Sequence, residues 1–256
     1  MDLIETADVT SGHRHPWEIA RLWVLRRLIG QHVPLDAGAV IVDIGCGDAF
    51  VIGELAASFP QATFFGVDAA LTDAVVSARQ AALPHNVRLF RDVEAVPAST
   101  AALVLLMDVL EHIRDDHGFL VDLLSRPMIG PRTQFIVTVP AYQSLFSSHD
   151  VFLKHFRRYT NSQLRDRLEH AGLRVSDIGY FFASLLPLRL LGVLKERILP
   201  SRNISGTGLT TYGGGAMGTW MLSALLKADA LAALTLRRIG ISIPGLSNYA
   251  VCRTSA

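Results

Sequence analysis

The chain has 256 residues, of which 50% are hydrophobic and 18% are charged, and its formal net charge at pH 7 is +1. This composition excludes a disordered chain, because enough apolar surface can be buried to offset the conformational entropy lost on folding. The near-neutral charge favours no nucleic-acid partner, and two cysteines are too few for a disulfide framework or a four-cysteine zinc site.

The N-terminal segment carries acidic residues and no apolar segment of the kind that directs export. No stretch of the sequence reaches the ~20 consecutive apolar residues that span a bilayer. With Cys46 and Cys252 as the cysteines, we expect a reducing, cytoplasmic compartment.

A helix is expected over residues 17–31, where apolar residues such as Leu22, Leu25 and Ile29 recur at helical spacing and Pro34 follows. We predict that residues 1–36 form an N-terminal helical lid. A helix that packs on the edge of the sheet is the alternative.

Short apolar runs then alternate with helical patterns. The runs have four to six residues and few polar positions, as is typical of strands buried on both faces of a parallel sheet. This alternation predicts an α/β fold with a Rossmann-like, doubly wound sheet. The predicted strands cover residues 39–44, 63–67, 87–90, 103–107 and 135–139, and the predicted helices cover 51–59, 72–83, 116–124 and 162–171.

Two later runs, 173–180 and 248–253, also have the pattern of strands. The chain between them is far longer than an ordinary loop, so we predict a helical insertion over residues 181–245. The α/β core of the protein would then consist of residues 37–180 and 246–256. Within the insertion we expect a helix over 219–238 and a mobile glycine-rich loop over 206–218.

The insertion is apolar and carries many basic residues. One interpretation is a helical cap that packs on the core. The other is a tunnel for a lipophilic ligand, or peripheral contact with a membrane through residues 181–240. The basic residues are Arg189, Lys195, Arg197, Arg202, Lys227, Arg237 and Arg238.

The segment Asp43-Ile44-Gly45-Cys46-Gly47 follows the first strand and opens into a helix. Its glycines let the backbone turn sharply and approach a ligand closely. A dinucleotide site is one alternative, but it requires a third glycine where Phe50 stands. An anionic pyrophosphate would not be stabilised by the Asp43 carboxylate, whereas the ammonium group of a cationic ligand would be.

Acidic residues follow four successive strands, at Asp43, Asp68, Asp92 and Asp108. Ligands of open α/β sheets bind beyond the carboxyl ends of the strands, where the strand order reverses. Asp68 lies 21 residues after Gly47, and an acid at this spacing suits the two hydroxyls of a ribose.

This combination of motifs resembles the class I S-adenosylmethionine-dependent methyltransferases, over about residues 40–175. The segments that carry the resemblance are 43–47, 66–68 and 108–113, and segments 155–159 and 15–17 are similar to the type 11/12-like subgroup. The resemblance implies a seven-stranded sheet, mostly parallel with the last strand antiparallel, and S-adenosylmethionine as cofactor.

The resemblance also implies roles for the residues of these motifs. The glycine turn and Asp43 would hold the methionine part of the cofactor, Asp68 its ribose, Asp92 and Val93 its adenine, and Asp108 the methyl-donating end. Cys46 is expected to be a small packed residue of the turn. The expected cofactor-binding residues are Asp43, Gly45, Cys46, Gly47, Asp68, Asp92, Val93 and Asp108.

Methyl transfer depends mainly on holding the acceptor in line with the methyl group, and a hydroxyl acceptor also benefits from a general base. Histidine titrates near neutral pH, so His112, His149 and His155 are the expected catalytic residues, with structural histidines as the alternative. Tyr142, Arg158 and Tyr159 are expected to bind substrate, because a guanidinium suits a carboxylate or phosphate.

His112, Asp115, Asp116 and His117 give no coherent set of four metal ligands, so we expect no metal and a capped helix start instead. We predict a biosynthetic methyltransferase that methylates a small or lipophilic metabolite, with oxygen as the expected acceptor atom. The alternatives are a non-catalytic binding protein with this fold and an NAD-dependent oxidoreductase.

Overall fold

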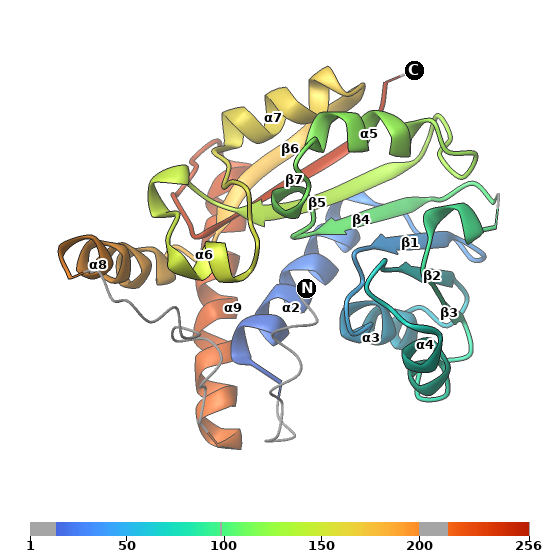
Figure 1. Cartoon of the computed structure of the whole chain (residues 1–256), viewed down its shortest axis with the longest axis horizontal. Helices are drawn as coiled ribbons and strands as arrows, with labels where there is room; N and C mark the ends of the chain where they lie inside the picture. Colours follow the sequence, from blue (N-terminus) through green and yellow to red (C-terminus); the bar gives the residue numbers. More distant parts are fainter. Residues whose placement is uncertain (1–13, 98, 200–214, 256) are drawn as a thin grey trace.

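The computed structural model describes residues 14–97, 99–199 and 215–255. Its centre is a seven-stranded sheet in the order β3-β2-β1-β4-β5-β7-β6 (Figure 1). All strands but β7 run parallel, and β7 is antiparallel to both β5 and β6. The predicted fold class is therefore confirmed, including the antiparallel last strand.

The strands lie where the apolar runs predict them, and no bound differs by more than one residue. Strand β5 is longer than expected by one residue at each end, because Gln134 and Pro140 also pair with β7. The strands are β1 (Val40–Ile44), β2 (Thr63–Val67), β3 (Val87–Phe90), β4 (Leu103–Met107), β5 (Gln134–Pro140), β6 (Leu173–Phe181) and β7 (Ser247–Thr254).

The helices that line the sheet were also predicted, whereas α6 and the short 3-10 turns η1, η2 and η3 were not. These segments of three to five residues are too short to show a helical period. The helices are α2 (Pro16–His32), α3 (Phe50–Ser58), α4 (Asp73–Gln80), α5 (Asp116–Leu124), α6 (Ser148–Phe152), α7 (Asn161–His170), α8 (Leu185–Ile198) and α9 (Ala216–Arg238), and the turns are η1 (Val93–Ala95), η2 (Leu110–His112) and η3 (Gln143–Leu145).

Neighbouring residues of each central strand enter different cores, because strand side chains alternate between faces. Ile41 packs into a core with α2, α3 and α9, whereas Val42 packs into a core with α5 and α7. Figure 1 shows these helices as two layers around the sheet. The sheet is thus covered on both faces, and its carboxyl edge is left for a ligand.

The helix α2 begins with a capping box. The His15 side chain accepts a hydrogen bond from Trp17 N, and the Glu18 carboxylate accepts one from His15 N. It packs on α9, and Leu25 and Leu28 are buried with Leu226 in one core. The N-terminal helix and the insertion therefore support each other. Closure of this helix as a lid stays a prediction, and residues 1–13 lie outside the described residues.

The insertion forms α8 and α9, and the expected glycine-rich loop lies outside the described residues except for its last part, 215–218. Within the described ranges, α9 alone is long and apolar enough to cross a membrane by length and composition. One third of the most apolar 18-residue stretch of α9 is buried in the protein. The helix packs against α2 and β6. The packing makes α9 an integral part of the fold.

Candidate functional site

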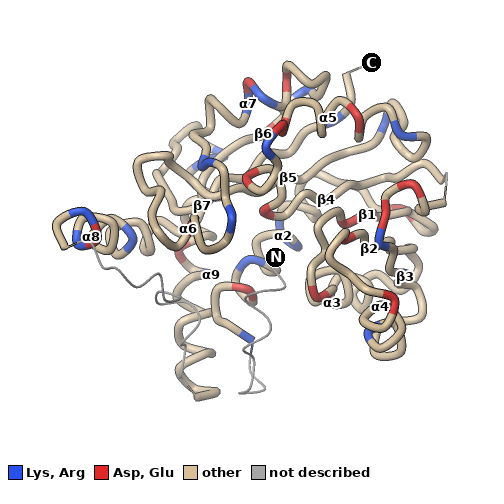
Figure 2. Tube along the Cα trace, viewed as in Figure 1, with Lys and Arg blue, Asp and Glu red and all other residues tan. Residues whose placement is uncertain are grey.

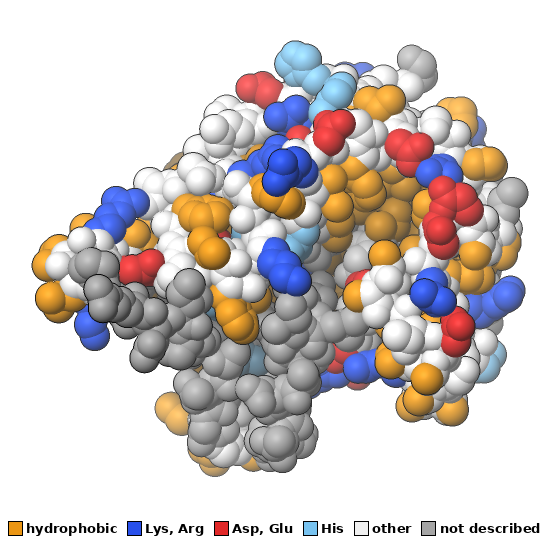
Figure 3. Space-filling model, viewed as in Figure 1, with side chains coloured by type: hydrophobic (Ala, Val, Ile, Leu, Met, Phe, Trp, Pro, Cys, Tyr) orange, Lys and Arg blue, Asp and Glu red, His pale blue; other side chains and the backbone are white. Residues whose placement is uncertain are grey.

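A cavity of about 490 Å³ lies beyond the carboxyl ends of β1, β2 and β4. β1 lies between β2 and β4, where the chain reverses its order in the sheet, and this is the position expected for a ligand. The space-filling view shows the opening with hydrophobic walls (Figure 3). The cavity contains six of the residues expected from the sequence, which are Gly45, Asp68, Asp92, Val93, Asp108 and His112.

The glycine turn joins β1 to the cavity wall. Gly45 has φ of +75°, and a Cβ atom there would lie 2.6 Å from the Val109 side chain, so only glycine fits. The Gly45 and Cys46 amides both donate to the carbonyl oxygen of Val67. These bonds hold the turn against the end of β2.

Asp68 is oriented by backbone amides on both of its oxygens. Gly47 N donates to Oδ2 at 2.8 Å, and Ala70 N donates to Oδ1 at 2.9 Å. Each carboxylate oxygen keeps a further lone pair, and both belong to a residue of the cavity wall. Asp68 can therefore accept hydrogen bonds from a pair of ligand hydroxyls.

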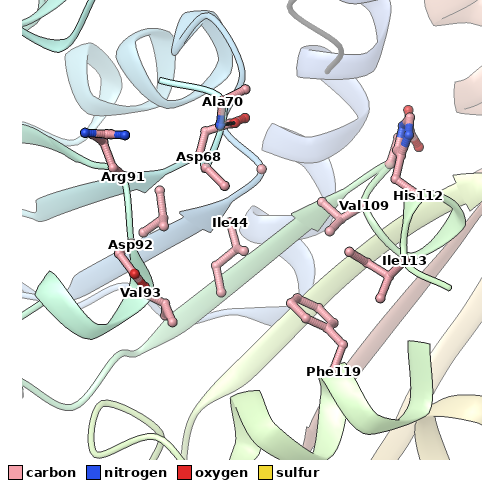
Figure 4. Close-up of a pocket in the computed structure, with 14 residues that line it drawn as sticks. Ile44, Asp68, Ala70, Arg91, Asp92, Val93, Val109, His112, Ile113 and Phe119 are labelled. Carbon is pink, nitrogen blue, oxygen red and sulfur yellow. Dashed lines mark hydrogen bonds between the residues drawn. The ribbon is translucent and has the colours of Figure 1, made fainter. Parts of the chain in front are cut away.

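Asp92 and Val93 lie on the same side of the cavity as Asp68, and Val109, Ile113 and Phe119 lie opposite them (Figure 4). Asp92 caps η1, where its Oδ1 accepts from Glu94 N at 3.3 Å. The space between an acid and these apolar side chains suits a flat ring with a polar edge.

Asp43 is buried at the end of β1, and its Oδ1 has no hydrogen-bond partner among the described residues. Burial, together with the nearby Asp68 carboxylate, raises the pKa of Asp43 to about 7, although Arg21 opposes the shift. A buried oxygen without a donor is costly, so a cationic ligand beside Asp43 would stabilise its ionised form.

Asp108 is held in the rare left-handed conformation, with φ of +55°. Arg21 Nη1 donates to its Oδ2 at 2.5 Å, and Thr138 Oγ1 donates to its Oδ1 at 3.0 Å. Burial alone would raise the pKa of Asp108, but the Arg21 guanidinium outweighs it and holds that pKa below its usual value. The cavity thus has a fixed, ionised carboxylate at the end of β4.

Arg21 was not among the expected site residues. Its guanidinium is buried and stacks on the Trp17 ring, 4.5 Å from the centroid, while it pairs with Asp108. The two partners are 87 residues apart in the chain. No local sequence pattern signals such a contact.

The expected catalytic histidines differ in position. His112 lines the cavity, and its ring meets that of His155 edge-on, with centroids 4.6 Å apart. His155 Nδ1 lies 2.9 Å from Asp150 Oδ1, which fixes the ring proton on Nδ1 and leaves Nε2 as a base. His155 is not itself among the cavity-lining residues and reaches the cavity wall through its contact with His112. His149 is buried in α6 and is also not among the lining residues.

The chemistry of His149 also argues against a role as a base. Burial, together with the Arg189 guanidinium, lowers the pKa of His149 to about 4. Its imidazole is therefore neutral and weakly basic at neutral pH. The structure favours His112 and His155 over His149.

Asp150 is the buried centre of an ion-pair network that the sequence did not predict. Arg158 Nε and Arg189 Nη2 each donate to it at 2.7 Å. It also closes the capping box of α6 with Ser147. The network fastens α6 and α8 to the segment between α6 and α7, which carries His155 and Arg158.

Two of the expected substrate-binding residues are paired inside the protein, and their role toward a substrate stays a prediction. The Arg158 guanidinium is buried against Asp150 and Ala141 O, and the Tyr159 hydroxyl donates to Asp116 Oδ2 at 2.8 Å in the core. These side chains already use their polar groups inside the protein and do not reach the cavity. Tyr142 is half-buried and stacks on Tyr180, so its role stays a prediction.

Cys46 is buried, and burial raises the pKa of its thiol, which agrees with a packed residue of the turn. Asp115 caps α5, as expected for a helix start, whereas Asp116 is buried and accepts a hydrogen bond from the Tyr159 hydroxyl. The structure instead brings one Glu111 carboxylate oxygen and one ring nitrogen from each of His112 and His155 within 4.8 Å of one another. The expectation of no metal stays a prediction.

Glu111 is fully buried in this group, and neither of its oxygens has a hydrogen-bond partner among the described residues. Burial, with the Asp108 carboxylate nearby, raises the pKa of Glu111 well above its usual value. Burial and the Asp108 carboxylate therefore both favour the protonated form of Glu111 over its ionised form.

A family model described as a methyltransferase domain matches residues 17–178, which is more than half of the chain. The chain belongs to this methyltransferase family. Because its seven-stranded sheet has the class I topology, it is a class I methyltransferase, and S-adenosylmethionine is its cofactor.

Solved methyltransferase structures share its fold. A structure described as a sarcosine dimethylglycine methyltransferase from Galdieria sulphuraria aligns over 93% of this chain and 86% of its own, with 14% identity and a TM-score of 0.56. A chain of the complex between the Haloferax volcanii Trm112 methyltransferase activator and its methyltransferase aligns over 93% and 95%, with 16% identity and a TM-score of 0.55.

A curated relative, trans-aconitate 2-methyltransferase from Azoarcus sp. (strain BH72), is 37% identical over 93 residues. The match covers 36% of this chain and 36% of the relative, so this chain spans about a third of the length of the curated relative that it matches.

The residues of the cavity fit the chemistry of the cofactor. S-adenosylmethionine presents cationic groups, a ribose with two hydroxyls and an adenine ring. The oriented carboxylate of Asp68 and the space between Asp92 and Phe119 offer a complement to the ribose and the adenine. The unpartnered oxygen of Asp43 offers a complement to a cationic group, although Asp43 is buried next to the lining residue Ile44 and does not itself line the cavity. Gly45 leaves the room that a side chain would fill.

Proposed function

We propose that this methyltransferase transfers a methyl group to an oxygen of a small or lipophilic metabolite in a biosynthetic reaction. The observation that carries the proposal is the pair of imidazoles at the cavity, in which His112 lines the wall and His155 is oriented by Asp150. The curated relative, which is named for trans-aconitate, supports a small acceptor.

The cofactor is held by the residues at the strand ends. Asp43 pairs with its ammonium group, Asp68 with the ribose hydroxyls, and Asp92 and Val93 with the adenine. Asp108 and Arg21 line the methyl-donating end. When bound, the cofactor supplies a methyl group that is activated by a sulfonium.

The acceptor lies between Asp108 and the imidazole pair, against apolar side chains such as Ile113. Its hydroxyl proton passes to the imidazole pair, because Asp150 keeps the Nε2 lone pair of His155 available. The fixed carboxylate of Asp108 favours the positive charge that develops on a histidine as it takes this proton.

An extract from a strain that lacks the gene, incubated with the purified enzyme and methyl-labelled S-adenosylmethionine, tests the proposal. We expect the acceptor, which is lighter than its product by one methylene, to disappear from the extract while a product labelled at oxygen forms. Label on nitrogen or carbon would contradict O-methylation. EDTA is expected to leave the rate unchanged.

His155→Ala is expected to lower kcat for this acceptor by roughly 10²- to 10⁴-fold, because the proton loses its acceptor. The dissociation constant of S-adenosylhomocysteine should stay within about twofold of the wild-type value. Calorimetry and single-turnover assays measure the two effects. His170→Ala, at an exposed position of α7, is the matched control, and equal turnover of both variants would contradict a role for His155.

A further inference from the structure

The exposed apolar side chains of the described residues gather on the insertion. All but three of the exposed large hydrophobic side chains lie within residues 188–241, and the three others are Val121, Val151 and Phe156. Folded monomers rarely leave so much apolar surface in one region without a function for it. We propose that the outer faces of α8 and α9 dock on the surface of an anionic lipid membrane.

The inner face of α8 is fixed to the protein. Arg189, Val193 and Glu196 share one side of the helix: Arg189 pairs with Asp150, Val193 is buried, and Glu196 accepts from Ser148 N at 2.9 Å. α8 is therefore held rigidly along the body, and it projects at the edge of the molecule (Figure 1).

The opposite side of α8 carries Leu191, Leu194 and Ile198, which we call the α8 outer face. These side chains are 63%, 43% and 74% exposed. Lys195 and Arg197 flank them on either side of the helix. An apolar stripe between long basic side chains is the pattern of a helix that lies in a membrane interface.

α9 repeats this arrangement. Ser223, Leu226 and Ala230 are buried on its inner side, whereas Met217, Trp220, Met221 and Leu225 form its outer face and are 58% to 70% exposed. No charged residue occurs in the helix before Lys227, and Figure 2 shows this first half of α9 without charges. Tryptophan at such a position is typical of the membrane interface.

The charged side chains on the exposed sides of α8 and α9 are basic, and this indicates which lipid headgroups they would bind. The acids of the two helices face the protein, since Glu196 binds Ser148 N and Asp229 accepts from Ser184. Lys195 on α8 and Arg238 at the end of α9 are exposed basic residues, and Arg197 is exposed although its Nη2 also donates to Ser144 O at 2.8 Å. Anionic headgroups complement this distribution, and zwitterionic headgroups do not.

Flotation of the full-length protein with vesicles tests the proposal. We expect it to float with phosphatidylglycerol-containing vesicles, and to float at least tenfold less with pure phosphatidylcholine or in 0.5 M salt, as expected where charges near a surface are screened. Leu191→Glu with Ile198→Glu should reduce binding to anionic vesicles at least tenfold. Val121→Glu, at an exposed position of α5, should bind as the wild type does.

Three results would overturn the proposal. The wild type could stay at the bottom with both vesicles, or the Leu191→Glu and Ile198→Glu variant could float as the wild type does. The wild type could also form a dimer in lipid-free solution that this variant converts to monomer, which would assign the faces to a second copy of the chain. Circular dichroism and binding of S-adenosylhomocysteine confirm that each variant is folded.

Discussion

Replacing Asp150 by Asn is expected to lower the free energy of unfolding at pH 7 by about 3–5 kcal/mol, the usual cost of removing one partner of a buried ion pair. Asp150 is fully buried and pairs with Arg158 and Arg189 at 2.7 Å each. Without the carboxylate, two guanidinium groups would remain in the interior without their counter-ion. Urea denaturation followed by circular dichroism measures the change.

The pH dependence of this difference gives an independent check. Burial alone would raise the pKa of Asp150, but the bonds from His155, Arg158 and Arg189 hold it well below its usual value. The contribution of Asp150 is therefore complete above its unfolded-state pKa of about 4 and is lost as the pH falls below that value. The wild type should thus approach the variant in stability below about pH 4.

Asp73→Asn is the matched control, because Asp73 pairs with Arg91 at the surface, where it is 88% exposed. Its effect is expected to stay below about 1 kcal/mol. A loss below about 1 kcal/mol for Asp150→Asn would show that the buried network does not stabilise the fold.

Replacing Asp43 by Asn is expected to weaken S-adenosylhomocysteine roughly 10- to 100-fold, which corresponds to one charge-assisted hydrogen bond of about 1.5–3 kcal/mol. The product retains the ammonium group that Asp43 is proposed to bind. Since burial raises the pKa of Asp43 to about 7, the ionised form must be generated for the cation to bind. Isothermal titration calorimetry measures the dissociation constant.

The same assay over pH separates this role from a structural one. Below about pH 7 the wild-type affinity should fall by up to tenfold per pH unit, because protonated Asp43 must lose its proton when the cation binds. The Asn variant should show no such dependence on Asp43. Asp36→Asn, at an exposed position before β1, should behave as the wild type, and a pH profile shared by all three proteins would contradict the assignment.

The sheet was predictable because its strands are buried on both faces. Runs such as 103–107 are continuously apolar, and β4 forms over these same residues with every side chain buried. The α/β alternation predicted a doubly wound sheet, and the antiparallel last strand was implied by the resemblance to class I methyltransferases. What the sequence could not provide was the meeting of distant helices, such as α2 with α9, since a helical period indicates an apolar face and not its partner.

The cofactor side of the site was predictable for the same geometric reason. Asp68, Asp92 and Asp108 follow parallel strands, so their Cα atoms necessarily meet at one edge of the sheet. The pairing of Arg158 and Tyr159 inside the protein was not predictable, because their partners Asp150 and Asp116 are contributed by α6 and α5. α6 has five residues, and such a helix carries no period that could reveal the buried acid.

The central claim is that the cavity beyond β1, β2 and β4 holds the cofactor. A crystal structure of the protein grown with S-adenosylhomocysteine tests it directly. We expect its ribose within hydrogen-bond distance of Asp68, its adenine beside Val93 and its ammonium group beside Asp43. Density for the nucleoside elsewhere, or a cavity that takes NADH and leaves S-adenosylhomocysteine unbound, would contradict the account.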